Sequence, residues 1–184
     1  MAEPYLLYVG QRGAYKNADV LLRAVAGDTT LRTRFRLVFF GGAEWSAEER
    51  NRLQELGLDD RVTMTGGTDD ELATWYAHAS AFVYPSLYEG FGVPPLEAMQ
   101  FDCPVIASRD GSLPEVIGDA GLFFDPHQAG ELSAALRQLD EDTALRENLI
   151  ARGRECHRRF TWTRCALQTA GEYRQLLKDS AHRD

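Results

Sequence analysis

The chain has 184 residues, of which 44% are hydrophobic and 26% charged, as expected for one globular domain with a well-formed core. Its formal net charge of −8 argues against a general nucleic-acid binder and against a protein held to anionic lipid by charge alone. Any anionic ligand must therefore be met by local positive groups. The three cysteines, Cys103, Cys156 and Cys165, have no metal-like spacing, and we interpret them as reduced thiols of a cytoplasmic protein.

Short apolar runs that stop at glycine, proline or a polar residue predict the strands. Runs of this kind are typical of the buried strands of a parallel sheet. The predicted strands cover residues 5–9, 35–40, 61–65, 81–84, 104–107 and 122–124.

Segments with apolar residues at helical spacing lie between and after these strands. The first predicted helix follows Asn17, a plausible N-cap, and ends at Gly27. The second follows Ser46-Ala-Glu-Glu49, a capping-box pattern. Further helices are predicted from residue 69 or 70, from Pro94, as a short turn at 113–117, around Leu132, at 143–154 and after Trp162.

Strands that alternate with helices predict an α/β fold, a Rossmann-like parallel sheet of about six strands with helices on both faces. Ligands of such sheets bind at the carboxyl ends of the strands, near a topological switch point. Three loops that follow predicted strands stand out, at residues 10–16, 41–44 and 86–92. We expect them to converge on one ligand.

The first of these loops carries two cations, Arg12 and Lys16. Arginine binds phosphate bidentately and lysine acts as a point charge, so a phosphate ligand suits this loop. The alternative is that both are solvated loop residues.

The segment 84–99 leads from a strand end through Gly90 and Gly92 into a helix start. This arrangement suits an anion, although a tight turn that needs positive φ explains the glycines equally well. Glu89 and Glu97 flank the glycines. They could be a general acid/base pair, surface carboxylates or acceptors for sugar hydroxyls.

The same segment, Tyr84-Pro-Ser-Leu-Tyr-Glu-Gly-Phe-Gly-Val-Pro-Pro-Leu-Glu-Ala-Met99, resembles the signature of retaining GT-B glycosyltransferases of family 4. Further matches follow in order along nearly the whole chain. They are Tyr8-Val-Gly, Tyr15-Lys-Asn17, Gly66…Leu72, Cys103-Pro-Val-Ile-Ala107, Gly111-Ser-Leu-Pro-Glu-Val116 and Phe160-Thr-Trp162. The resemblance implies the C-terminal, donor-binding half of such an enzyme. Residues 1–162 would form the nucleotide-sugar-binding domain, and 163–184 a helix that crosses towards an N-terminal acceptor domain that this sequence lacks.

The resemblance also implies roles for individual residues. Lys16, with Arg12, would bind the donor diphosphate and stabilise the leaving group, while Glu89 would contact the transferred sugar and Glu97 the ribose. The remaining donor-binding positions are Gly10, Gly66, Thr68, Gly90, Phe91, Gly92 and Val93. Two positions depart from the family pattern, because Gln11 stands where many members have the arginine and Asp102 stands where many have glycine.

These roles describe retaining transfer of a hexose from a sugar nucleotide. A GDP-sugar is favoured, with mannose as the candidate sugar, and the acceptor would be a glycan or a lipid-linked sugar. No cofactor is expected, and because no Asp-x-Asp pattern or histidine cluster suggests a metal site, metal-independent transfer is favoured. The full-length protein could be peripheral at the inner membrane face.

Two alternatives remain: a binding module without turnover, and a sugar-nucleotide epimerase, which the Gly90–Glu97 segment disfavours. We expect the last helix to dock on its own domain, to pair with a second copy or to fray.

Overall fold

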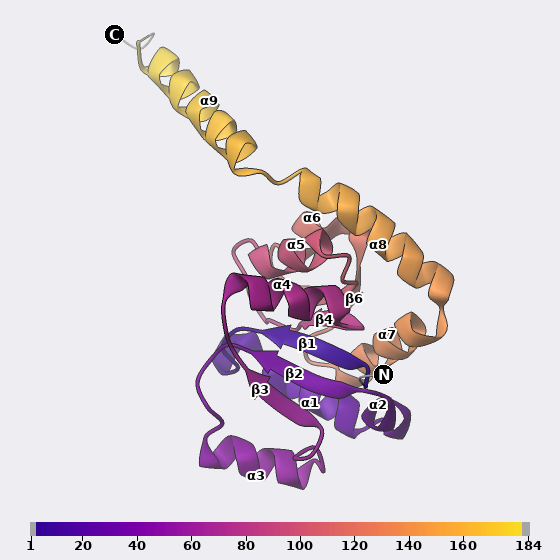
Figure 1. Ribbon diagram of the computed structural model, residues 1–184. Helices are drawn as coiled ribbons and strands as arrows, with labels where there is room; N and C mark the ends of the chain where they lie inside the picture. The colour runs from indigo at the N-terminus through magenta and orange to yellow at the C-terminus, as the bar shows by residue number, and fades with distance from the viewer. Residues whose placement is uncertain (1–2, 182–184) are drawn as a thin grey trace.

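The computed structural model describes residues 3–181 and contains one parallel sheet of six strands in the order β3-β2-β1-β4-β5-β6. The strands are β1 (Tyr5–Val9), β2 (Arg36–Phe40), β3 (Val62–Thr65), β4 (Ala81–Tyr84), β5 (Val105–Ser108) and β6 (Gly121–Phe124). The predicted fold class is confirmed (Figure 1).

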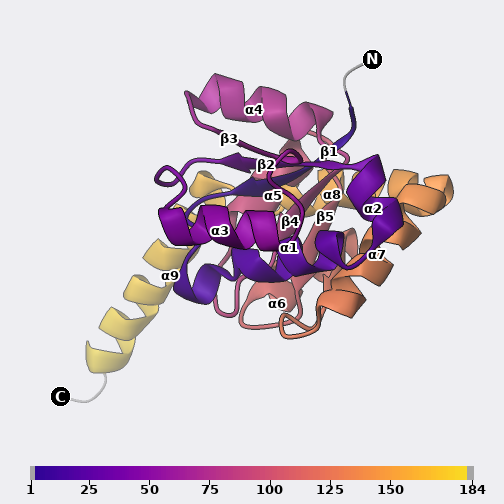
Figure 2. The same ribbon diagram turned by 90° about the horizontal axis from the view of Figure 1, so that it is seen from below.

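Nine α-helices and two short 3-10 helices are present among the described residues. They are η1 (Ala14–Lys16), α1 (Ala18–Ala26), α2 (Thr29–Arg34), α3 (Ala47–Glu55), α4 (Asp69–His78), α5 (Val93–Gln100), α6 (Leu113–Ile117), η2 (Gly118–Ala120), α7 (Ala129–Glu141), α8 (Thr143–Arg158) and α9 (Trp162–Ala181). Helices α1 and α4 lie on opposite sides of the strands (Figure 2).

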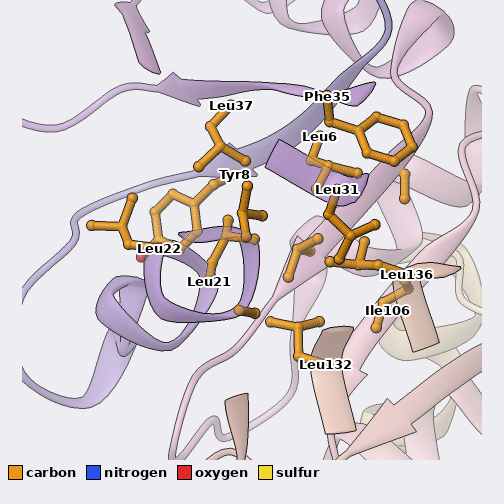
Figure 3. Packing of buried hydrophobic residues seen from close by; sticks show 14 of the residues in the cluster. Leu6, Tyr8, Leu21, Leu22, Leu31, Phe35, Leu37, Ile106, Leu132 and Leu136 are labelled. Carbon is orange, nitrogen blue, oxygen red and sulfur yellow. The ribbon is translucent and has the colours of Figure 1, made fainter. Parts of the chain in front are cut away.

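Alternate residues of each strand point to opposite faces of the sheet, so two hydrophobic clusters form. Leu6 and Tyr8 of β1 join the first cluster with α1, α2 and α7, as Figure 3 shows. Leu7 of β1 faces the second cluster, which α4, α5 and α6 cover. Continuous apolar strands are buried from both sides for this reason, as the sequence predicted.

The position of β1 creates the topological switch point of the sheet. The chain runs outwards from β1 through β2 to β3, and then returns to place β4 on the other side of β1. Helix α1 follows β1 on one face, and α5 follows β4 on the opposite face. The chain therefore leaves β1 and β4 towards opposite faces of the sheet, and ligands of open α/β sheets bind at the carboxyl ends of strands at such a point.

The structure corrects several details of the sequence prediction. Helix α2 was not predicted, because its six residues provide too few turns for a periodic signal; Asp28 caps it by accepting a hydrogen bond from Leu31 N. Helix α8 extends four residues beyond the predicted end at 154. Asn17 precedes α1 but does not cap it through its side chain. Its backbone is left-handed, and its amide instead donates to the carbonyls of Pro85 and Pro126 at 3.1 and 2.9 Å.

Helix α9 projects away from the domain (Figure 1). Trp162 at its start is 88% exposed, and Leu167 and Tyr173 are also exposed. Docking of this helix on its own domain is therefore not observed, and it is regular through Ala181. Residues 182–184 of the predicted helical range lie outside the described residues.

Candidate functional site

The loops that follow β1 and β4 meet at the switch point. Leu87 N donates to Tyr15 O at 2.7 Å, and the Asn17 amide reaches the Pro85 carbonyl, so backbone and side-chain bonds join the two loops. The Tyr8 hydroxyl at the end of β1 donates to the Gln11 carbonyl and to the Lys16 carbonyl at 3.5 Å. Lys16 is thereby placed over the end of β4.

Lys16 and Glu89 form an ion pair at this switch point. The distance from Lys16 Nζ to Glu89 Oε1 is 2.7 Å, and the two side chains are 20% and 13% exposed. The Lys16 ammonium also lies 3.4 Å from the hydroxyl of Tyr84, the last residue of β4. Burial alone would raise the pKa of the Glu89 carboxyl, but the Lys16 hydrogen bond and the nearby hydroxyls of Ser86 and Tyr84 hold that pKa below its usual value.

The backbone of Glu89 is held from the neighbouring loop after β5. The Ser112 hydroxyl donates to the Glu89 carbonyl at 2.9 Å. Gly111 has a φ of 57°, and a Cβ there would lie 3.0 Å from that same carbonyl oxygen. The close approach explains a glycine at this position, and the Ser112 bond fixes the position of the Glu89 carbonyl.

The start of α5 lies directly after Glu89. Gly92 is the N-cap of α5 with a φ of 95°, and a Cβ on it would lie 2.6 Å from Leu113 Cδ2. Gly90 has open space around it, and Phe91 and Val93 are exposed. Pro94 and Pro95 in the first turn of α5 have no backbone N–H, so the amides of Gly90, Phe91, Gly92 and Val93 remain as candidate donors next to the Lys16–Glu89 pair.

Arg12 does not join the Lys16–Glu89 pair. Its side chain is 7% exposed and turns towards the loop after β2, where it bonds Glu49 Oε1 at 2.9 Å and the Ala43 carbonyl at 2.7 Å. Its guanidinium lies 4.1 Å from the centre of the Trp45 ring. The Arg12 hydrogen bond is the main cause that lowers the pKa of the Glu49 carboxyl. Arg12 therefore connects two of the three predicted loops.

Glu97 and the loop at 66–68 lie on the α4 side of the sheet. The half-buried Glu97 accepts a hydrogen bond from the Tyr76 hydroxyl of α4 at 3.3 Å. Thr68 caps α4 in a capping box with Glu71. Burial and the neighbouring Glu97 carboxylate raise the pKa of Tyr76. Neither a hydrogen bond nor an ion pair joins Glu97 to Lys16 or Glu89 in the described structure, so the two predicted glutamates are not a hydrogen-bonded pair.

Comparison with known proteins identifies the family. The sequence profile "Glycosyl transferases group 1" matches residues 1–156. The chain belongs to this family.

Relatives of this group 1 domain include mannosyltransferases. O-antigen chain mannosyltransferase B of Escherichia coli is 39% identical over 175 residues, which cover 94% of this chain and 46% of that protein. The chain spans less than half the length of curated relatives such as this mannosyltransferase.

Solved structures share the fold of the group 1 domain. Sucrose-phosphate synthase of Thermosynechococcus elongatus has a TM-score of 0.82 and 36% identity, over 96% of this chain and 46% of that chain. The C-terminal domain of a glycosyl transferase group 1 family protein of Francisella tularensis has a TM-score of 0.69 and 26% identity, over 83% of both chains. The predicted family is thus confirmed.

Two hydroxyl-bearing residues of the group 1 domain's site were missed at the sequence level. Tyr84 at the end of β4 and Ser86 just after it are buried; the Tyr84 hydroxyl lies 3.4 Å from Lys16 Nζ, and both hydroxyls contribute to the lowered pKa of the Glu89 carboxyl. A hydroxyl-bearing residue at the end of an otherwise apolar strand is a sequence signal that could have identified both residues. Tyr15 and Tyr88, both exposed, belong to these two joined loops.

A hollow of about 650 Å³ lies between α1 and α3 of the group 1 domain, lined by Asp19, Trp45, Glu49 and Arg52 among others. This hollow shares no residue with the Lys16–Glu89 pair. We place the candidate site at the switch point instead, because the predicted cation and the predicted carboxylate are in contact there. The described part of the chain contains no group of three or more His, Cys, Asp or Glu residues arranged to hold a metal ion. Between residues 3 and 181, no helix is both long and apolar enough to cross a bilayer.

Proposed function

We propose that this chain is the donor-binding half of a retaining glycosyltransferase that transfers a hexose from a nucleoside diphosphate sugar without a metal ion. The observation that carries the proposal is the Lys16–Glu89 pair at the β1/β4 switch point, beside the start of α5. A cation, free helix amides and a carboxylate are the groups that a diphosphate-linked sugar needs in one place. GDP-mannose is the first candidate donor, because the relatives include mannosyltransferases.

In this proposal, Lys16 and the amides at Gly90, Phe91, Gly92 and Val93 bind the diphosphate. Transfer of the sugar builds negative charge on the departing diphosphate, and a preorganised ammonium with helix amides stabilises that charge. Glu89 accepts hydrogen bonds from hydroxyls of the transferred sugar, because an ionised carboxylate is an acceptor only.

The nucleoside would extend from this point towards α4. Glu97, on the α4-facing side of α5, accepts the ribose hydroxyls, and the backbone at Gly10 and at Gly66–Thr68 borders the nucleoside. The loops after β1 and β3 end at the same edge of the sheet, which supports one continuous binding surface. Arg12 acts indirectly, by holding the loop after β2 against the loop after β1.

The acceptor, a glycan or a lipid-linked sugar, would bind in a second domain. The relatives are more than twice as long as their matched segment, which supports a two-domain enzyme. We infer that the chain alone binds the donor and does not transfer sugar. The alternative, a binding module without turnover in any context, predicts the same binding and no activity after the second domain is supplied.

Thermal unfolding with GDP, UDP and ADP tests the proposal. A nucleotide present at about 100 times its dissociation constant should stabilise the chain by about 2.7 kcal/mol. Lys16→Ala should abolish this stabilisation, whereas Arg50→Ala, which removes an exposed positive charge from α3, should keep it. If no nucleotide raises the melting temperature of the wild type, the donor-site proposal fails.

A further inference from the structure

The half-buried Glu97 carboxylate has one hydrogen-bond donor in the described part of the chain, and that donor is a buried tyrosine. The Tyr76 hydroxyl of α4 donates to Glu97 Oε2 at 3.3 Å. Between residues 3 and 181, Glu97 takes part in no ion pair, and its second oxygen, Oε1, accepts no hydrogen bond. Oε1 is not one of the fully buried unpaired atoms, so a ligand can reach it.

Packing around the Tyr76 ring fixes the position of its hydroxyl. Tyr76 is 1% exposed and packs against two aromatic side chains. Its ring is nearly perpendicular to the Phe82 ring of β4, with centroids 5.4 Å apart, and it stacks on the Phe101 ring at 6.2 Å. Phe101 directly follows α5, the helix that carries Glu97, and α4 and α5 pack side by side (Figure 1). The buried ring therefore presents its hydroxyl to Glu97 with little freedom to move.

The position of Glu97 on α5 relates it to the start of that helix. Glu97 follows Val93 by four residues, so the two lie on the same face of α5, one turn apart. In the proposed function, the amides from Gly90 to Val93 bind the diphosphate. A ribose attached to that diphosphate meets the α5 face one turn further along, where Glu97 lies.

We propose that Tyr76 positions Glu97 for ribose recognition: the phenol holds Oε2, while Oε1 accepts hydrogen bonds from the vicinal hydroxyls of the ribose. The site thereby selects ribonucleotides over deoxyribonucleotides. An ionised carboxylate only accepts hydrogen bonds, so it suits a diol and gains nothing from a ligand that lacks one. The inference rests on the proposed function. Tyr76 is a positioning residue, since it acts on the ligand through Glu97.

The alternative is that the Tyr76–Glu97 bond has a structural role alone. A buried phenol needs a hydrogen-bond partner, and Glu97 provides one whether or not it binds a ligand. The two roles differ in one measurable quantity, the ratio of the affinities for a ribonucleotide and for its dideoxy form. Loss of a structural bond changes both affinities alike, whereas loss of a positioning bond changes only the affinity for the ribonucleotide.

Calorimetric titration of the full chain with GDP and with 2′,3′-dideoxy-GDP measures this ratio. The wild type should bind GDP about a hundredfold more tightly than the dideoxy form, because two hydrogen bonds to a charged acceptor are lost with the hydroxyls. Tyr76→Phe keeps the ring and removes the phenol. Because the 3.3 Å bond is long for an O–H···O pair, we expect a moderate effect: GDP binding should weaken about tenfold, and dideoxy-GDP binding by no more than about twofold. An equal loss for both ligands, or no loss for either, overturns the proposal.

Glu97→Ala completes a double-mutant cycle with Tyr76→Phe. Glu97→Ala should abolish the preference for GDP over its dideoxy form, and Tyr76→Phe should then cause no further loss of GDP affinity. Additive losses in the double variant contradict an action through Glu97. If Tyr76→Phe folds poorly, 4-fluorophenylalanine in place of Tyr76 is the second variant, because its fluorine fills the space of the hydroxyl and cannot donate a hydrogen bond.

Tyr5→Phe is the matched control for the phenol. The Tyr5 hydroxyl donates to the Trp75 carbonyl of the same helix α4 at 2.7 Å, and the Tyr5 ring packs against the same hydrophobic cluster as Tyr76. This variant should lower the melting temperature and keep the preference for the ribonucleotide. A preference reduced as much as in Tyr76→Phe would indicate a general loosening of α4, and it would refute a specific role for Tyr76.

The wild-type titrations separate failure of the inference from failure of the proposed function. If UDP or ADP binds and GDP does not, that nucleotide is compared with its own dideoxy form. Binding of a nucleoside diphosphate without any preference for the ribose refutes the role of Tyr76 and Glu97 alone, and the diphosphate site stands. Absence of binding by GDP, UDP and ADP refutes the proposed function, and the inference falls with it.

Discussion

Replacing Arg12 by alanine should lower stability and spare nucleotide binding. The change removes a charged hydrogen bond to the Ala43 carbonyl, worth about 1.5 kcal/mol, and a contact with the Trp45 ring, worth about 1 kcal/mol. It also breaks the ion pair with Glu49, which adds roughly 0.5–1 kcal/mol because Glu49 is 34% exposed and partly screened by solvent. The free energy of unfolding should fall by about 3 kcal/mol, and the melting temperature by roughly 6–12 °C for a chain of this size.

Thermal unfolding and calorimetric titration with GDP on the same samples separate stability from binding. At a temperature where Arg12→Ala is folded, its affinity for GDP should stay within about threefold of the wild type, a difference below 1 kcal/mol. Lys16→Met is the matched comparison, and it should lose affinity far more than it loses stability. The reasoning is refuted if Arg12→Ala melts like the wild type but binds GDP a hundredfold more weakly, because the guanidinium must then leave Glu49 for the phosphate.

Three further predictions concern the backbone and the acidic groups. Gly92→Ala should destabilise the chain by about 2–4 kcal/mol in denaturant unfolding, through a left-handed backbone and contact with Leu113, whereas Gly90→Ala, with open space around it, should be tolerated. Asp102 also has a left-handed backbone, with a φ of 59°, and an exposed bidentate pair with Arg154. The free energy of unfolding of Asp102→Gly should therefore be close to that of the wild type, whereas Asp102→Ala should lower it by about 1–2 kcal/mol. Equal free energies of unfolding for the two variants would contradict this account. The pKa of Glu89 is lowered in the folded state, so its contribution to stability is present above the unfolded glutamate pKa of about 4.3 and is lost as the pH falls through the lower folded value. The stability advantage of the wild type over Lys16→Met should consequently shrink in acid unfolding below about pH 4, and an advantage independent of pH would contradict the ion-pair explanation.

Local interactions explain which parts of the fold could be predicted. The apolar runs that became β1 and β4 and the capping box at Ser46 and Glu49 depend on neighbours within a few residues, and all of them were found from the sequence. The six-residue α2 was missed because it presents only one buried residue, Leu31, and gives no repeating pattern. Asn17 was misread because it has the residue type of a cap while its amide serves two carbonyls, those of Pro85 and Pro126.

The site was predicted in its parts but not in its connections. Lys16 and Glu89 were both candidates, and the family resemblance suggested roles for them. Their direct contact joins residues 73 positions apart in the sequence. Arg12 was predicted to bind the diphosphate together with Lys16. In the structure its guanidinium instead lies over the Trp45 ring and pairs with the Glu49 carboxylate.

The sequence by itself determined the alternation of strands and helices, the family, and the residue types available at the strand ends, because periodicity and motif spacing are local properties of the chain. Only the tertiary structure decided that β4 returns beside β1, and hence that Lys16 meets Glu89 next to the hydroxyl of Tyr84. The physical reason is that the partner of a charged side chain depends on which distant strands pack side by side. That choice is made by the burial of both sheet faces, and no local pattern contains it.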